Sequence, residues 1–164
     1  MRVGAGLAYA ALTFGSFPHP VGRSVVDLGV VLAWLAPIPL LALVSGLRPR
    51  RAAGAAFLAG LAAHAAVLHW IYVVTVTYGH APPAVGVIAP VLLAAYVALH
   101  TAAFGAGAAG LARIGRDGPV ALAALWTALD HLRSFFLSGF PWAVLGYAQH
   151  RNPAMTGLAP WAGV

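Results

Sequence analysis

The chain has 164 residues, of which 62% are hydrophobic and only 7% are charged, and its mean hydropathy is +0.88. Soluble domains carry about a quarter charged residues, so this composition excludes a soluble domain and predicts an integral membrane protein. The net charge of +6 comes from nine arginines and three aspartates. Because the arginines lie at segment ends, as topology signals do, we expect no nucleic-acid binding. The sequence has no cysteine, which excludes disulfides, thiolate metal sites and a cysteine nucleophile within these residues.

Two apolar helical segments precede the first arginine cluster. Residues 3–17 form a short one, which we interpret as a retained span because no small-residue cleavage site and polar region follow it. Residues 25–44 form the second. Pro37 and Pro39 predict a kink or break there, since proline removes helix hydrogen bonds.

A third segment, residues 52–77, is rich in alanine and glycine. Ala56 and Gly60 form a small-xxx-small pair, which predicts close approach of a second helix. Trp70 lies near the end of the segment, as expected of an interfacial aromatic residue. Residues 79–83 then predict a loop.

The second half predicts helices at residues 85–112 and 120–137, and residues 155–164 resemble the start of another. Residues 105–110 match G-x-G-x-x-G, the dinucleotide fingerprint, but they lie late in an apolar helix with no strand before them. Close helix packing explains these glycines better. The predicted fold is therefore all-α, a polytopic transmembrane bundle of about five spans plus the start of a sixth.

The arginines predict the orientation of this bundle. With the N-terminus in the cytoplasm, six arginines lie inside and three lie outside, which obeys the positive-inside rule better than the inverse. The six are Arg2, Arg48, Arg50, Arg51, Arg113 and Arg116, and the three are Arg23, Arg133 and Arg151.

The seven histidines do not predict a metal site. His64 and His69 are five residues apart, about 140° around a helix, so they cannot chelate from one face. No H-x-x-x-H or H-E-x-x-H pattern occurs, and the aspartates are isolated in the sequence. We expect neither a metal nor a cofactor.

Residues 126–149 contain the features that distinguish this chain from plain membrane helices. Asp130 and Arg133 share one helical face, and an ionisable pair in a span is by default a functional hypothesis. The alternative is a structural pair at the outer edge of the helices. Residues 139–142, Gly-Phe-Pro-Trp, which we call the corner, break the helix. Trp142 is either an interfacial tryptophan or an indole aimed by the corner.

The corner and other stretches resemble bacterial apolipoprotein N-acyltransferases in order and spacing. The matching residues are Ser138 to Trp142 with Gly146-Tyr147-Ala148-Gln149, Trp70 to Val73 with Tyr78-Gly79, Leu93 to Tyr96 with Thr101 and Phe104, Trp126 to Asp130 with Leu132 and Arg133, and Gly157 to Pro160 with Gly163-Val164.

The resemblance implies an enzyme of the bacterial inner membrane whose active side faces the periplasm. Such enzymes transfer an acyl chain from a phospholipid to the diacylglyceryl-cysteine of a lipoprotein, through a thioester on a cysteine. It implies a substrate-binding surface at Gly139, Phe140, Pro141, Trp142 and Tyr147, supported by Asp130, Arg133 and Gln149. The partners implied are a phospholipid donor, a lipoprotein acceptor and the membrane.

The family's Glu-Lys-Cys triad lies in a nitrilase-like domain, and the sequence has no glutamate, lysine or cysteine. We therefore expect residues 1–164 to be the N-terminal transmembrane domain, truncated before the nitrilase-like domain, with no catalytic residue and no activity alone. The alternative is a non-catalytic scaffold or lipid-binding module that works with a separate catalytic chain. A small transporter is the least favoured reading, because we expect the ion pair at the edge of the helices.

Overall fold

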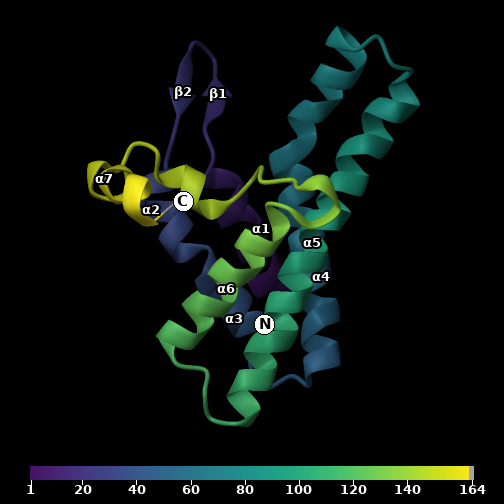
Figure 1. Cartoon of the computed structure of the whole chain (residues 1–164). Coiled ribbons are helices and arrows are strands. Elements are labelled where there is room, and N and C mark those ends of the chain that lie inside the picture. Colours follow the sequence, from purple (N-terminus) through teal and green to yellow (C-terminus); the bar gives the residue numbers. More distant parts are fainter. Residues whose placement is uncertain (163–164) are drawn as a thin grey trace.

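A computed structural model describes residues 1–162 of the chain, and most of them are helical (Figure 1). The α-helices are α1 (Arg2–Gly15), α2 (Gly29–Leu35), α3 (Pro37–Val44), α4 (Pro49–Val67), α5 (Pro83–Arg113), α6 (Pro119–Arg133) and α7 (Pro153–Ala162). This confirms the all-α prediction. Gly163 and Val164, which belong to the predicted start of a sixth segment, lie outside the described residues.

The longest helical paths belong to α4 and α5. A 3-10 turn (Leu68–Trp70) and a π-helical stretch (Val73–Tyr78) extend α4, so Pro49–Tyr78 forms one apolar path of 30 residues. With the 31 residues of α5, it is one of two helices in the described chain that are long and apolar enough to cross a membrane. Gly79 ends the first path and Pro83 begins α5, as the sequence predicts.

Small residues let α4 and α5 pack almost backbone to backbone. A Cβ atom on Gly60 would lie 2.8 Å from the Thr101 side chain, and one on Gly105 would lie 2.6 Å from the Ala56 Cβ. Real Cβ atoms do not approach so closely, so each glycine is required for this packing. Gly107 faces Leu125 of α6 in the same way, whereas Gly110 has open space beside it. Both the small-xxx-small prediction and the packing interpretation of residues 105–110 are confirmed.

The main core lies where α1, α3, α4 and α5 meet, and α6 packs on its outside. Its buried members are mostly alanines, with a few larger side chains contributed by α1, α3 and α5: Tyr9, Leu40, Leu43, Val44 and Phe104. Trp126 of α6 meets Phe104 edge to face, with ring centroids 4.9 Å apart.

The second predicted segment, residues 25–44, is partly wrong. Its first residues belong to a hairpin of β1 (His19–Val21) and β2 (Ser24–Val26), which the sequence analysis did not predict. Gly22 has a φ of +62° in the two-residue turn, a conformation typical of such hairpins. The Asp27 carboxylate accepts a hydrogen bond from the Gly29 N–H at 3.1 Å, and the helix begins there. The break expected from the prolines is confirmed, since α2 ends at Leu35 and α3 begins at Pro37.

One end of the molecule carries most of the arginines. The α3–α4 and α5–α6 connections lie together at the bottom of Figure 1, and they hold Arg48 and Arg116. Arg2 donates a hydrogen bond to the Ser45 carbonyl oxygen at 3.5 Å, which brings the N-terminus to the same end. We call this the arginine end. The β1–β2 hairpin and the α4–α5 connection extend from the opposite end.

Candidate functional site

The corner begins where α6 stops. The helix ends at Arg133, four residues before the predicted end at Leu137, so that boundary was wrong. Leu137 (φ 51°) and Gly139 (φ +80°) both take the left-handed conformation, which a helix cannot contain. The Phe140 N–H donates to the Arg133 carbonyl oxygen at 3.1 Å and closes the turn.

Gly139 fixes the direction of the chain at this turn. A Cβ atom there would overlap the carbonyl oxygen of Ser134. Ala143, on the far side of the corner, also has a positive φ of 62°. Left-handed residues other than glycine cost about 1 kcal/mol or more, so packing elsewhere must hold this backbone in place.

Packing under the corner comes from the end of α4 and from α5. Phe140 and Ala143 rest on a buried cluster formed by Leu68, Ile71 and Ala94. This second core is separate from the main one and lies toward the end opposite the arginines. The corner is therefore seated on the α4–α5 pair.

Two indoles lie side by side at the corner. The Trp70 and Trp142 rings have centroids 5.6 Å apart and are tilted by 53°. Trp142 is 56% exposed and Trp70 is 38% exposed, so the pair presents ring surface outward. Tyr147 is 43% exposed a few residues further on. Aromatic rings of this kind suit the boundary between apolar and polar surroundings.

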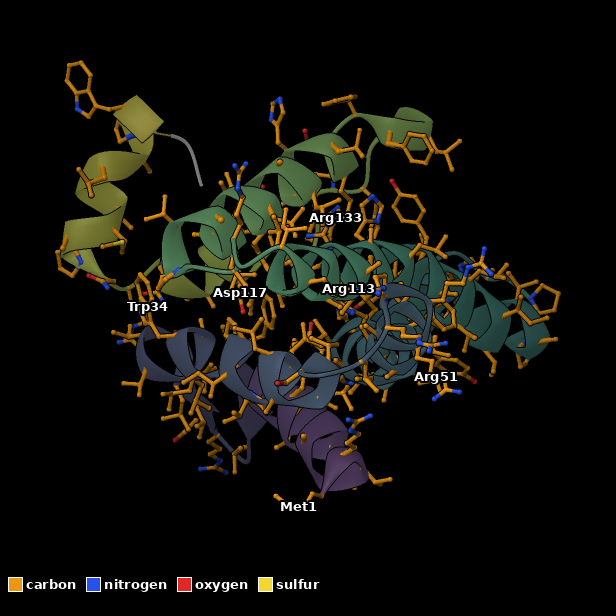
Figure 2. The ribbon with its side chains drawn as sticks, turned by 90° about the horizontal axis from the view of Figure 1, so that it is seen from below. Met1, Trp34, Arg51, Arg113, Asp117 and Arg133 are labelled. Carbon is orange, nitrogen blue, oxygen red and sulfur yellow. The ribbon has the colours of Figure 1, made fainter. Side chains whose placement is uncertain are left out.

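Hydrogen bonds fix the chain on both sides of the corner. Before it, the Tyr96 hydroxyl of α5 donates to the Phe136 carbonyl oxygen at 2.9 Å. After it, the buried Gln149 side chain donates to the Gly29 carbonyl oxygen at 2.9 Å. The Trp34 indole N–H in turn donates to the Gln149 amide oxygen at 3.2 Å, and Figure 2 shows Trp34 on α2 next to the C-terminal segment.

A buried polar cluster lies beneath the corner. It surrounds a cavity of about 20 Å³ that Ala143 and Leu145 also line. The cluster consists of seven side chains from four helices: Tyr9, Thr13, His64, His100, Thr101, Asp130 and Arg133. That volume is about what one water molecule needs. We call these seven residues the polar cluster.

The ion pair of α6 belongs to this cluster. Arg133 and Asp130 are 3.1 Å apart, and Arg133 is only 2% exposed, on the side of α6 that faces α5 (Figure 2). Arg133 is the last residue of α6, so the pair lies at the end of that helix, as expected, but it faces the inside of the bundle rather than its surface. The guanidinium Nε has no hydrogen-bond partner among the described residues. A buried charge with one partner is destabilised by desolvation and depends strongly on that partner.

Five of the seven members were missed by the sequence analysis. His64 was considered only as a metal ligand, and instead its Nδ1 lies 2.7 Å from the Gly60 carbonyl oxygen within its own helix. Tyr9 and Thr13 are four residues apart, and His100 and Thr101 are adjacent. A polar pair within an apolar helix indicates a candidate functional site, so the sequence did contain a signal for these four residues. What the spacing did not reveal is that α1, α4 and α5 direct these residues to one point.

Asp27, expected to be isolated, has two basic partners in the structure. Its side chain is buried, and its carboxylate lies 3.3 Å from His150 and 3.9 Å from Arg151. These contacts join the β2–α2 turn to the segment that follows the corner. Within residues 1–162 no group of three histidine and aspartate side chains has the arrangement of a metal site.

The described chain combines long apolar helices, a buried ion pair and two exposed indoles at one turn. These features are typical of helical membrane proteins that present an aromatic surface next to a buried polar cluster. The apolipoprotein N-acyltransferase N-terminal domain matches residues 9–164. The chain belongs to this family.

Curated relatives carry the same name. The chain is 39% identical over 153 residues to the apolipoprotein N-acyltransferase of Geobacter metallireducens, which covers 91% of this chain and 27% of that protein. It is 37% identical to the enzyme of the same name from Nitrosomonas europaea, and the match covers 80% of this chain and 28% of that protein. It is 36% identical to the one from Photobacterium profundum, and that match covers 100% of this chain and 30% of that protein. The chain thus spans less than a third of the length of these relatives. The two apolar helices and this family together identify a membrane protein.

Proposed function

We propose that this chain is the membrane domain of an apolipoprotein N-acyltransferase, which acylates the diacylglyceryl-cysteine of lipoproteins at the expense of a phospholipid. The observation that carries the proposal is the exposed indole pair of Trp70 and Trp142 on a corner whose backbone is fixed on both sides. Both substrates carry acyl chains, and aromatic rings at a membrane boundary bind such chains without needing a hydrogen bond.

The substrate surface is the corner, Gly139, Phe140, Pro141 and Trp142, together with Tyr147. Exposed Trp142 and Tyr147 contact lipid, whereas Phe140, packed on the second core, holds the backbone. Asp130 and Arg133 support the corner from below. Gln149 supports it from the side through α2.

The orientation we propose has the N-terminus and the arginine end in the cytoplasm and the corner on the periplasmic side of the bacterial inner membrane. It is supported by the gathering of six arginines at one end. The proposed spans are α1, the kinked α2–α3 pair, α4, α5 and α6, with α7 at the start of a sixth. Gly29–Val44 has only 16 residues, so the second span requires both of its short helices.

The catalytic groups are supplied from elsewhere, because residues 1–164 hold no cysteine, lysine or glutamate. We propose that a nitrilase-like domain with a Glu-Lys-Cys set completes the enzyme, either in a longer polypeptide or as a separate chain. Alone, this chain binds lipid and transfers nothing.

The test is reconstitution in proteoliposomes with a diacylated lipopeptide as acceptor. The chain is assayed alone and joined to the remaining part of the Geobacter metallireducens relative, and N-acylation is measured by mass spectrometry. We expect N-acylated product from the joined protein only. No product from the joined protein, although it is folded and inserted, contradicts the proposal, and product from the chain alone contradicts its dependence on a second domain.

A further inference from the structure

A groove of about 590 Å³ opens at the arginine end, far from the corner. It lies between α3 and the ends of α5 and α6 that approach it. Its walls are apolar side chains, among them Leu41, Ala112 and Leu122. Its size is that of pockets that hold small ligands, and Ser45 is the single uncharged polar side chain among its described lining residues.

Among the described lining residues of this groove, the charged side chains are two arginines and one aspartate. Arg48, which precedes α4, and Arg113, which ends α5, come from two different helix ends. Asp117 is the single acidic member, and Figure 2, seen from the arginine end, shows it with Arg113. A groove lined by apolar side chains and two arginines matches an amphiphile with a negative headgroup and apolar tails.

The groove also lies at the depth of a lipid headgroup. The 31 residues of α5 extend about 46 Å, whereas the apolar core of a bilayer is about 30 Å thick. The ends of α4 and α5 that carry Arg48 and Arg113 therefore reach the headgroup region. Basic pockets between membrane helices bind anionic lipid headgroups in this position.

We propose that this groove binds an anionic phospholipid of the leaflet at the arginine end, with its phosphate on Arg48 and Arg113 and an acyl chain along α3 and α5. Asp117 accepts a hydrogen bond from a headgroup hydroxyl, which a glycerol headgroup provides. This end carries six arginines and one aspartate, so its positive charge favours an anionic lipid over a neutral one. This site is independent of acyl transfer, since it lies at the opposite end from the corner.

The chain offers a matched control for the charge. Arg50 and Arg51 are exposed at the same end, yet they are not among the described lining residues of the groove. The double variant R50Q/R51Q therefore removes the same charge as R48Q/R113Q without touching the groove. A third variant, Ala112→Trp, fills the groove at an exposed lining position and leaves every arginine in place.

The experiment is native mass spectrometry of the detergent-purified chain with phosphatidylglycerol, phosphatidylethanolamine or phosphatidylcholine, with circular dichroism to verify folding. We expect one tightly retained phosphatidylglycerol, bound roughly tenfold more weakly by R48Q/R113Q and by A112W and little changed by R50Q/R51Q. Equal retention of the three lipids overturns the proposal. So does an equal loss in both double variants, which indicates diffuse surface charge, or full binding by folded A112W.

Discussion

Between α4 and α5 many of the side chains are alanine or glycine, and the helices approach closely at Gly60 and Gly105. Residues 134–149 have the opposite character, with left-handed residues, exposed indoles and only short helical turns. The first region is stabilised by its own close packing. The second is stabilised by neighbours, which are the second core below Phe140, the Tyr96 hydroxyl, the Gln149 amide and the polar cluster.

In a membrane protein, an irregular segment such as residues 134–149 can keep a defined surface only when neighbouring elements support it. Backbone N–H and carbonyl groups outside regular helices need hydrogen-bond partners from other parts of the protein, because lipid supplies none. The corner packs on the α4–α5 pair, and side chains from several helices support it. Substitutions in the two regions should therefore fail for different reasons, and four predictions, in order of expected loss of stability, test this.

The largest effect is expected at the junction of the two regions. Asp130→Asn keeps the size of the side chain but removes the negative charge that pairs with buried Arg133. We expect a loss of about 3 kcal/mol in the free energy of unfolding, measured by denaturation in detergent micelles, because the guanidinium is left uncompensated. Asp117→Asn, the same change at an exposed aspartate, should have little effect. Equal stability of the two variants would mean that the pair does not support the corner.

The second prediction concerns the helix pair alone. Gly105→Ala places a Cβ 2.6 Å from that of Ala56 and 3.0 Å from the Ala52 carbonyl oxygen, so α4 and α5 must separate. We expect a loss of about 2 kcal/mol by the same measurement, from overpacking. Gly110→Ala on the same helix meets open space and should cost nothing. If both variants unfold alike, close packing does not hold this pair together.

The third prediction weakens the side support of the second region. Gln149→Leu leaves the Gly29 carbonyl oxygen and the Trp34 indole N–H without their partner. We expect a loss of about 1.5 kcal/mol, the cost of buried polar groups left unpaired. Hydrogen exchange should rise in α2 and in residues 145–149, but not in α4.

Asn152→Ala serves as the graded comparison for this third change. It removes the hydrogen bond to the Gln149 amide oxygen, 3.0 Å long, and an exposed one from the Ala154 N–H, 3.2 Å long, and should cost less. An equal rise in exchange along α4 in Gln149→Leu would contradict the idea that the two regions are stabilised separately.

The same difference explains what could be predicted from the sequence. The path of α4 and α5 follows from composition and from glycine spacing, both of which are local, and their boundaries were correct within a few residues. The end of α6 was placed at Leu137 because Ser138-Gly139 interrupts the apolar pattern there, whereas the helix ends at Arg133 and Leu137 takes a left-handed conformation. Arg133 likewise lies at a cavity that it shares with Tyr9, which is far away in sequence.

The β1–β2 hairpin shows a second limit of the sequence. Val25 and Val26 continue an apolar run, and hydropathy alone assigns them to the following helix. Only the Gly22 turn and the hydrogen bond between Asp27 and the Gly29 N–H separate strand from helix, and both signals are short. The corner itself was found from the sequence because glycine and proline interrupt an apolar pattern, but its support was not.

The smallest loss of stability is expected for Trp142→Ala, and this variant tests the proposed function most directly. The indole is 56% exposed and touches Trp70 at one edge of the corner, so unfolding should change by less than about 0.5 kcal/mol. In the joined, catalytically complete protein, acyl transfer from phospholipid should fall about tenfold, mainly through a higher apparent KM for the lipid, because the ring surface that holds an acyl chain is lost. Trp161→Ala removes an indole that is 90% exposed on α7, and it should leave transfer unchanged. Equal transfer by both variants would show that Trp142 is only an interfacial residue, and that the irregular backbone at residues 137–143 is not kept for lipid binding.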